Sequence, residues 1–139
     1  MIDTFKQIEL SKAKFINIKN KSGKVVDVKA VTEKKKYLLV FNINVIDALD
    51  NKYAQDNKNG FEVFLEKIDS KDTANIWRTS VDFLVMCINE GIRQKNVHRK
   101  SVGLKEDEYI KNEEINITAL DATNLAIQVI NNGVPEQKN

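Results

Sequence analysis

The sequence predicts an α+β protein, in which a small N-terminal antiparallel β-meander packs against a helical remainder of about four to five helices. Strand-forming residues alternate between turn signals as far as residue 41, and from residue 42 onward apolar residues recur at helical spacing. The length of 139 residues fits a single domain with a modest core. The predicted parts are a loose N-terminal arm at 1–13, the meander at 14–41, the helical part at 42–132 and a frayed tail at 133–139.

The meander is expected to contain three strands, at 14–19, 24–31 and 36–41. These segments are rich in β-branched and aromatic residues, which favour strands. Residues 20–23, Asn-Lys-Ser-Gly, are a turn signal between the first two strands, and the polar segment 32–36 connects the second to the third. Because a lone hairpin is marginal in water, we expect a helix to pack on one face of this sheet.

The strand "YLLVF" (37–41) runs directly into the first predicted helix, at 44–54. Asn42 or Asn44 is the expected N-cap, because an asparagine side chain can accept a hydrogen bond from the free N–H groups of a first helical turn. A short second helix is predicted at 61–68, where apolar residues stand at positions i, i+3, i+4 and i+7.

The longest helix is expected at about 72–94, and its wide apolar stripe predicts a central position in the fold. Gly91 costs about 1 kcal/mol relative to alanine in a helix interior, so the last turn of this helix is expected to fray. A basic loop at 95–104, a short acidic helix at 105–114 and a final helix at 119–131 complete the prediction.

Composition and charge exclude several classes of protein. The net charge of +2 comes from 22 basic and 20 acidic residues, which is too balanced to indicate a nucleic-acid or membrane partner. The single cysteine, Cys87, excludes an intrachain disulfide and favours a reduced cytoplasmic setting. No signal peptide is expected, and the longest apolar run, 83–88, is far shorter than the roughly 20 residues that span a bilayer.

Side chains with reactive or metal-binding chemistry are sparse. His98, the only histidine, is expected in a solvated loop, and Cys87 lies in an apolar helical run that predicts a buried, inert thiol. Trp77 is interpreted as a core anchor, with an exposed partner-binding role as the alternative. The sequence contains no P-loop, CxxC or GxSxG motif. We therefore expect neither enzymatic activity nor a bound metal or cofactor.

Two charged clusters each have a solvated and a binding interpretation. The acidic cluster lacks the ligand spacing and the turn glycine of a calcium loop, so a solvated helix face is expected. The basic cluster is the patch that could contact phosphates, but no aromatic residue interleaves with it. The acidic members are Glu106, Asp107, Glu108, Glu113 and Glu114, and the basic members are Arg93, Lys95, His98, Arg99 and Lys100.

The order of the elements carries a resemblance to a known family. The strand "YLLVF" runs into "NINVIDALDNKYA", then come the short helix "GFEVFLEKI", a long helix ending "FLVMCINEGIRQ", a charged loop, a short acidic helix and a final helix with small residues. Over roughly 37–132 this order resembles the tail assembly chaperones of long-tailed bacteriophages and of related prophages in Gram-positive bacteria. The predicted hairpin at 14–31 also fits that pattern.

The resemblance implies a chaperone that coats the hydrophobic helices of the tape measure protein, recruits subunits of the tail tube (the major tail protein), and leaves before the virion is finished. It implies a location in the bacterial host cytoplasm, and homo-oligomers are expected. The helices at 61–68 and 119–131 are expected to be partly exposed and to bind partners by helix-in-groove docking. The predicted partner-binding residues are Phe61, Phe64, Leu65, Ile68, Leu125 and Val129.

Two other classes of function stay open at this point. The chain is alternatively a small nucleic-acid-associated phage regulator that uses the basic loop at 93–100, or a structural head–tail connector or tail terminator protein. Retention on DNA that weakens steeply with salt would identify the first. A gene position between a tail tube gene and a very long tape measure gene would favour the chaperone.

Overall fold

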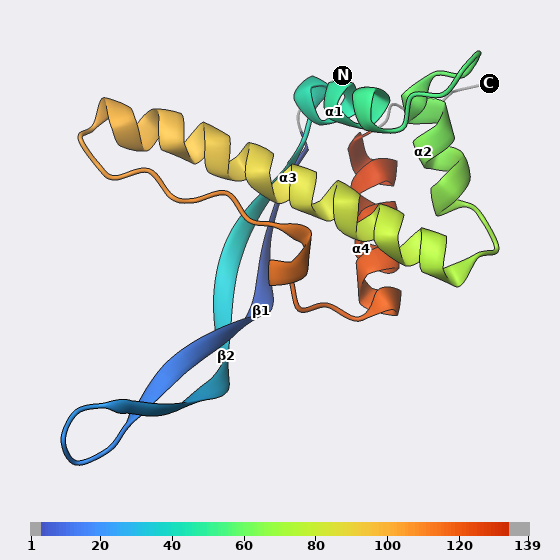
Figure 1. Cartoon of the computed structure of the whole chain (residues 1–139). Helices are drawn as coiled ribbons and strands as arrows, with labels where there is room; N and C mark the ends of the chain where they lie inside the picture. The colour runs from blue at the N-terminus through green and yellow to red at the C-terminus, as the bar shows by residue number, and fades with distance from the viewer. Residues whose placement is uncertain (1–3, 134–139) are drawn as a thin grey trace.

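A computed structural model describes residues 4–133 and has the predicted α+β architecture, with an antiparallel sheet at the N-terminus followed by helices (Figure 1). The two strands form one long hairpin, and the helices gather around its base. The elements are β1 (Thr4–Lys19), β2 (Val25–Phe41), α1 (Ile43–Lys52), α2 (Gly60–Ile68), α3 (Thr73–Ser101), the short 3-10 turn η1 (Asn112–Glu114) and α4 (Ala119–Gly133). Beyond Gly133, the predicted frayed tail lies outside the described residues.

The predicted three-stranded meander is wrong in its pairing. Residues 37–41 pair with residues 4–8 rather than with 24–31, and the predicted connection at 32–36 simply continues strand β2. The sheet therefore has two strands of 16 and 17 residues instead of three short ones.

The predicted loose arm at 1–13 is also wrong, because strand β1 begins at Thr4. Ile8 and Leu10 alternate with polar neighbours, and both pack against the hydrophobic core. Apolar side chains at alternate positions are the pattern of a half-buried strand. Ile8 lies directly opposite the buried Tyr37 of β2, so this segment completes the base of the hairpin.

The turn at the tip of the hairpin forms where the sequence predicts it. The Gly23 N–H donates to the Asn20 carbonyl at 3.0 Å, and the Asn20 side-chain oxygen accepts from the N–H groups of Ser22 and Lys24. Gly23 has a φ of +83°, a backbone region that glycine enters without steric cost.

The strand-to-helix junction is short because Asn42 caps α1 directly after β2. Its side-chain oxygen accepts from the N–H groups of Asn44 and Val45, at 3.1 and 3.3 Å. Helix α2 then packs closely on α1, since a Cβ atom on Gly60 would lie 1.9 Å from the Asp50 carbonyl oxygen. The predicted helices at 44–54 and 61–68 are thus confirmed, within the usual uncertainty of helix ends.

Helix α3 is central, as predicted, but it continues to Ser101 rather than ending at 94. Most of the predicted basic loop at 95–104 is therefore helical. Gly91 does not fray the helix, because it is the point at which α3 touches β2. A Cβ atom there would lie 1.9 Å from the Leu38 carbonyl oxygen, so glycine lets the helix backbone rest against the strand.

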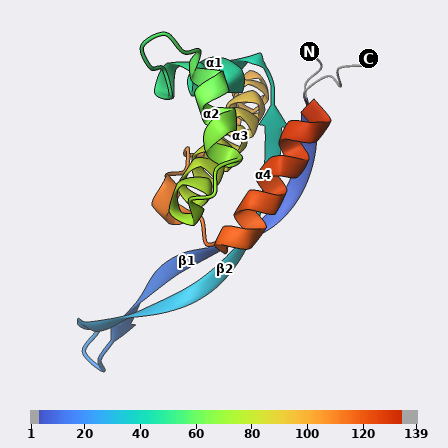
Figure 2. The same ribbon diagram turned by 90° about the vertical axis from the view of Figure 1, so that its right-hand side faces the viewer.

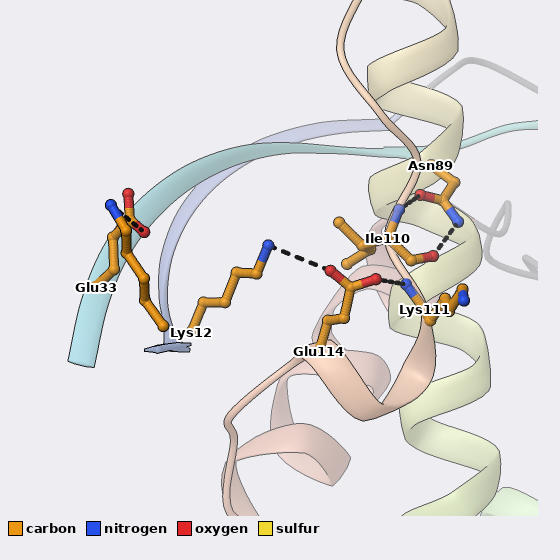
Figure 3. Close-up of polar contacts among 7 residues, drawn as sticks. Lys12, Glu33, Asn89, Ile110, Lys111 and Glu114 are labelled. Atoms are coloured by element: carbon orange, nitrogen blue, oxygen red, sulfur yellow. Dashed lines mark hydrogen bonds and ion pairs between the residues drawn. The ribbon is translucent and has the colours of Figure 1, made fainter. Parts of the chain in front are cut away.

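The predicted short helix at 105–114 is wrong except for the single turn η1. The segment instead runs back along α3 in an extended form (Figure 1). The side-chain amides of Asn89 and Asn96 in α3 each bond the N–H and the carbonyl of one residue in this segment, as the backbone of a neighbouring strand would. Asn96 accepts from the Asp107 N–H at 2.8 Å and donates to its carbonyl at 2.9 Å, and Asn89 bonds both backbone groups of Ile110 in the same way (Figure 3).

The hydrophobic core lies where the base of the hairpin meets α1, α2, α3 and α4. Its centre is aromatic: the rings of Phe41 and Phe83 meet edge to face at 5.1 Å, and those of Phe64 and Phe83 lie 5.3 Å apart. Such pairs contribute about 0.5–1.5 kcal/mol beyond the burial of their area. All three side chains are fully buried, so they fix the helices on the sheet.

We predict that Gly91→Ala destabilises the protein by about 1–3 kcal/mol, even though alanine is the better helix former by about 1 kcal/mol. The added methyl group would force α3 away from the Leu38 carbonyl. Urea denaturation would measure the change, with the exposed Lys95→Ala on the same helix as the control. Equal or greater stability of Gly91→Ala would contradict the close contact.

Candidate partner-binding surface

Residues 12–36 of the hairpin, here called the arm, project from the helical body into solvent (Figures 1 and 2). Two-stranded ribbons usually hide apolar side chains against a body, because a pair of strands is marginal alone. The arm instead carries six large apolar side chains that are at least 40% exposed. They are Phe15, Ile16, Ile18, Val25, Val26 and Val28.

The two faces of the arm differ in chemistry. Residues directly opposite in an antiparallel pair share a face, and successive residues alternate between faces. One face, here called the uncharged face, carries Phe15 opposite Ala30 and Asn17 opposite Val28. The other, here called the charged face, continues the core-facing side of the hairpin. Its members are Lys12, Lys14, Ile16 and Ile18 of β1 with Asp27, Lys29, Val31 and Glu33 of β2.

The charge of the chain is strongly segregated although its total is small. The arm contains nine lysines and two carboxylates, Asp27 and Glu33, so it has a net charge of +7 while the remaining residues sum to −5. A second basic segment, 93–105, contains five lysine or arginine residues and no acidic one. Lys35 and Lys36 at the root of the arm share a small cavity lining with Lys95 and Arg99 of that segment.

The root of the arm is tied to η1 by an ion pair. Lys12 Nζ lies 3.2 Å from Glu114 Oε2, and the other carboxylate oxygen, Oε1, accepts from the Lys111 N–H at 3.1 Å (Figure 3). The hydrogen bond from Lys12, and then the one from the Lys111 backbone, lowers the pKa of Glu114, and the same ion pair raises the pKa of Lys12. Both side chains are about a third exposed, so the pair contributes at most about 1 kcal/mol.

A groove runs beside the outer edge of β1 at the root of the arm, with a volume of about 620 Å³. The edge itself is already used once, since the Asn116 N–H donates to the Ser11 carbonyl at 3.1 Å. The groove is lined on one side by residues 8–11 and on the other by Ile117 and Leu125. The strand edge and apolar side chains meet here, and the charged residues of the lining are Lys6, Glu9 and Asp121.

The six residues predicted to bind partners have unequal exposure. Phe64 and Val129 are buried in the core, and Phe61 stacks on Phe64 at 5.8 Å. Leu65 is 37% exposed, and Leu125 reaches the groove beside β1. Phe61, Ile68 and Leu125 are half-buried against the core. Phe64 and Val129 thus serve packing in the folded chain, and the binding role of the other four stays a prediction.

Cys87, His98 and Trp77, the other residues singled out from the sequence, lie in three different environments. Cys87 is buried, and burial raises the pKa of its thiol, so it is kept as the neutral group. His98 is exposed near the end of α3. Trp77 is 45% exposed rather than a core anchor, and it lines an open cleft of about 420 Å³ with Val81 and Asn112.

The described residues contain neither a metal-binding cluster nor a helix that could span a membrane. Between residues 4 and 133, no group of three or more His, Cys, Asp or Glu side chains lies close enough to hold a metal ion. The acidic cluster at 106–114 is divided instead, with Asp107 bound to Arg99 at 3.1 Å and Glu114 to Lys12. Over the same range, no helix is both long enough and apolar enough to cross a bilayer.

Comparison of the chain with models of known protein families, with curated proteins and with solved structures finds no match. The surface described above is therefore interpreted from its own chemistry.

Sequence reasoning missed the arm as a surface, although it identified the strand-forming segments in it. The signal was present in the lysines, which flank the apolar segments 15–18 and 25–28 on both sides. Lysine on an exposed strand edge is a device that prevents unwanted pairing between sheets. A net charge calculated over the whole chain hides this concentration.

We predict that Phe64→Asp prevents folding, whereas Leu65→Asp leaves the fold intact. Phe64 is fully buried among Tyr53, Phe61 and Phe83, where an unpaired carboxylate is costly. Leu65 is already 37% exposed, so its replacement changes stability by about 1 kcal/mol or less. Circular dichroism and thermal unfolding of the two variants would test this, and a folded Phe64→Asp protein would overturn the core assignment.

We predict a pH dependence at the root of the arm. Because the pKa of Glu114 is lowered on folding, its contribution to stability is present above its ordinary pKa of 4.5 and is lost as pH falls through the lowered value. NMR titration of the Glu114 carboxyl group would measure the shift. In Lys12→Met the pKa should move back toward 4.5, since Lys12 is the largest cause of the shift. An unchanged pKa in that variant would contradict the ion pair.

Proposed function

We propose that the protein is a non-catalytic tail assembly chaperone of a long-tailed phage or prophage. In this role it binds the tape measure protein and recruits tail tube subunits during tail morphogenesis, in the cytoplasm of the bacterial host. The proposal rests on the sequence resemblance over 37–132 and on the surface chemistry of the arm. A chaperone of this kind acts by covering apolar surface of its client, so it must expose apolar surface of its own.

The observation that carries the proposal is the uncovered apolar surface of the arm. Phe15 is 68% exposed and Val28 55%, and they stand on the same uncharged face. Exposed apolar patches on soluble proteins mark sites of protein association, because covering them removes apolar area from water. Lysines surround this face, so the free protein is protected from non-specific aggregation.

The proposed partners follow from this surface and from the resemblance. The tape measure protein would cover the arm and the exposed part of α2 around Leu65. In the absence of a client, homo-oligomers would cover the exposed part of α2 around Leu65. The protein would leave the tail before the virion is complete, because its binding surface is needed only while the client is unprotected.

A nucleic-acid-associated regulator is the second candidate, favoured by one observation. The arm has a net charge of +7, and a two-stranded ribbon fits the major groove of a duplex. This moves the candidate contact from the basic helix end at 93–100 to the arm. DNA retention with a steep salt dependence would support it. A structural connector or tail terminator would instead be found in purified virions.

We predict that co-expression with the tape measure protein of the same genome moves that protein from the insoluble to the soluble fraction and that the two co-purify. The double variant Phe15→Asp/Val28→Asp should lose this effect while keeping its fold, because both side chains already face solvent. Western blotting of the two fractions provides the measurement. Ile43→Asp is the matched control, because Ile43 is a 60% exposed apolar residue on the helical body outside the proposed binding surface. A tape measure protein that stays insoluble with the unaltered chain would refute the proposed function.

A further inference from the structure

From Ala13 to Asn17, the outer edge of β1 has no backbone partner among residues 4–133, and its outward groups follow a defined pattern. The Asn116 N–H donates to the Ser11 carbonyl, so the backbone groups of Ser11 point away from β2. Outward and inward backbone groups alternate along an antiparallel strand. The N–H and carbonyl groups of Ala13, Phe15 and Asn17 therefore point outward too.

An independent contact on the other strand agrees with this assignment. The Val28 N–H is bonded to the Asp27 carboxylate at 2.8 Å. Val28 lies opposite Asn17. Because the Ser11 carbonyl faces outward, the alternation along the strands makes Asn17 and Val28 a pair whose backbone groups point away from each other. On β2 a side chain therefore satisfies the outward N–H at this position. The β1 edge has no such side-chain contact among the described hydrogen bonds of residues 12–17.

The side chains along this edge specify what kind of strand would fit it. On the charged face, β1 presents Lys12 and Lys14 and then Ile16, and residues 10–19 contain three lysines and no carboxylate. On the uncharged face it presents Ala13 and Phe15. An added strand has its side chains beside these residues, because neighbouring strands share their faces. Carboxylates would fit opposite the lysines, and apolar side chains opposite Ala13 and Phe15.

We infer that the outer edge of β1, from Ala13 to Asn17, is a β-augmentation site for an acidic protein segment in which carboxylates alternate with apolar residues. The partner adds as a third strand, so backbone hydrogen bonds supply affinity and the alternation supplies selectivity. The inference rests on the proposed function in one respect, that the occupant is a protein client.

Charge complementarity separates this occupant from others. Two arms of this chain would bring net charges of +7 together, so direct pairing between copies through the arms is opposed. A nucleic acid would match the lysines but would leave Phe15, Ile16 and Val28 without apolar neighbours, and the arm contains no arginine for bidentate contacts to bases. A strand in which carboxylates alternate with apolar residues would place its carboxylates beside the lysines and its apolar side chains beside the exposed apolar residues.

An added third strand would also stabilise the arm. Two-stranded ribbons are marginal in water, and three strands with an apolar face are the usual minimum for independent stability. At the root, the groove beside β1 already carries apolar side chains such as Ile8 and Leu125 at the same edge. The Asn116–Ser11 hydrogen bond already occupies the edge there, and the groove also carries Glu9 and Asp121, so an added acidic strand would end where the groove begins.

The test uses the full chain and a fluorescent decapeptide of alternating valine and glutamate, with binding followed by fluorescence anisotropy. We expect saturable binding that weakens at high salt. A matched valine–lysine decapeptide, a polyglutamate of the same length and a short DNA duplex serve as comparison probes. Selective binding of the valine–glutamate peptide is expected. Equal binding of polyglutamate or tighter binding of the duplex would overturn the inference in favour of a general polyanion surface.

Two variants locate the site. Ala13→Pro removes an outward N–H and leaves the ladder to β2 intact, so we expect binding to weaken by about tenfold while Ala13→Ser has little effect. Lys14→Glu should weaken binding similarly, and Lys71→Glu, an exposed site on the helical body with the same charge change, should not. NMR amide shifts would confirm that the arm stays paired in Ala13→Pro. Unchanged affinity in that variant, with the arm intact, would overturn the edge as the binding site.

The outcomes separate the inference from the proposed function. Peptide binding does not involve the tape measure protein, and the co-expression experiment does not depend on which edge is used. A solubilised tape measure protein combined with no peptide binding would retain the chaperone and reject the β1 edge. Dissociation of oligomers by Ala13→Pro, without peptide binding, would assign the edge to self-association and also reject the inference.

Discussion

The contact between Gly91 of α3 and the Leu38 carbonyl of β2 determines how the molecule is divided. A helix whose backbone rests on a strand crosses it at one fixed point, since no side chain separates the two. On one side of that point, Leu39 and Phe41 enter the core. On the other side, Tyr37 is the last buried residue of the strand, and from Lys36 outward the strand becomes the arm. A single residue without a side chain therefore separates the part of the hairpin that packs from the part that is free to bind.

The extended segment before η1 stabilises this arrangement from the other side of α3. A segment with so many carboxylates would be expected to prefer solvent, but Asn89 and Asn96 bind its backbone at Ile110 and Asp107. Each amide satisfies one N–H and one carbonyl, which would otherwise be left without a protein partner near a buried surface. The carboxylates then remain available to pair with basic groups, as Glu114 does with Lys12 at the root of the arm.

The sequence was sufficient for the fold class and for the capped helices, because these depend on local rules. Asn42 caps α1 and Asp72 caps α3 through short side-chain contacts that neighbouring residues specify. The pairing of β1 with β2 depends on residues up to 37 positions apart, and the lysines at 34–36 concealed the continuity of β2. Gly91 was misjudged for the same reason, since its partner Leu38 is distant in sequence. The core role of Phe64 and the exposure of Phe15 likewise follow from tertiary position, which residue type does not reveal.

Strand β2 is exposed to solvent near Val25 and buried in the core near Phe41, so its backbone hydrogen bonds should open at different rates along its length. Amide hydrogens exchange with water when their hydrogen bonds open, and the cost of opening follows local burial. Near Val28 the ladder can separate without disturbing any core side chain, whereas near Phe41 it can open only when the molecule unfolds. Protection should therefore rise along the strand from the turn at Asn20 to the junction at Asn42. Amide exchange in β2 thus occurs by local fraying near the turn and by global unfolding near Phe41. A bound client would raise the protection of the arm and so reduce the difference between the two ends.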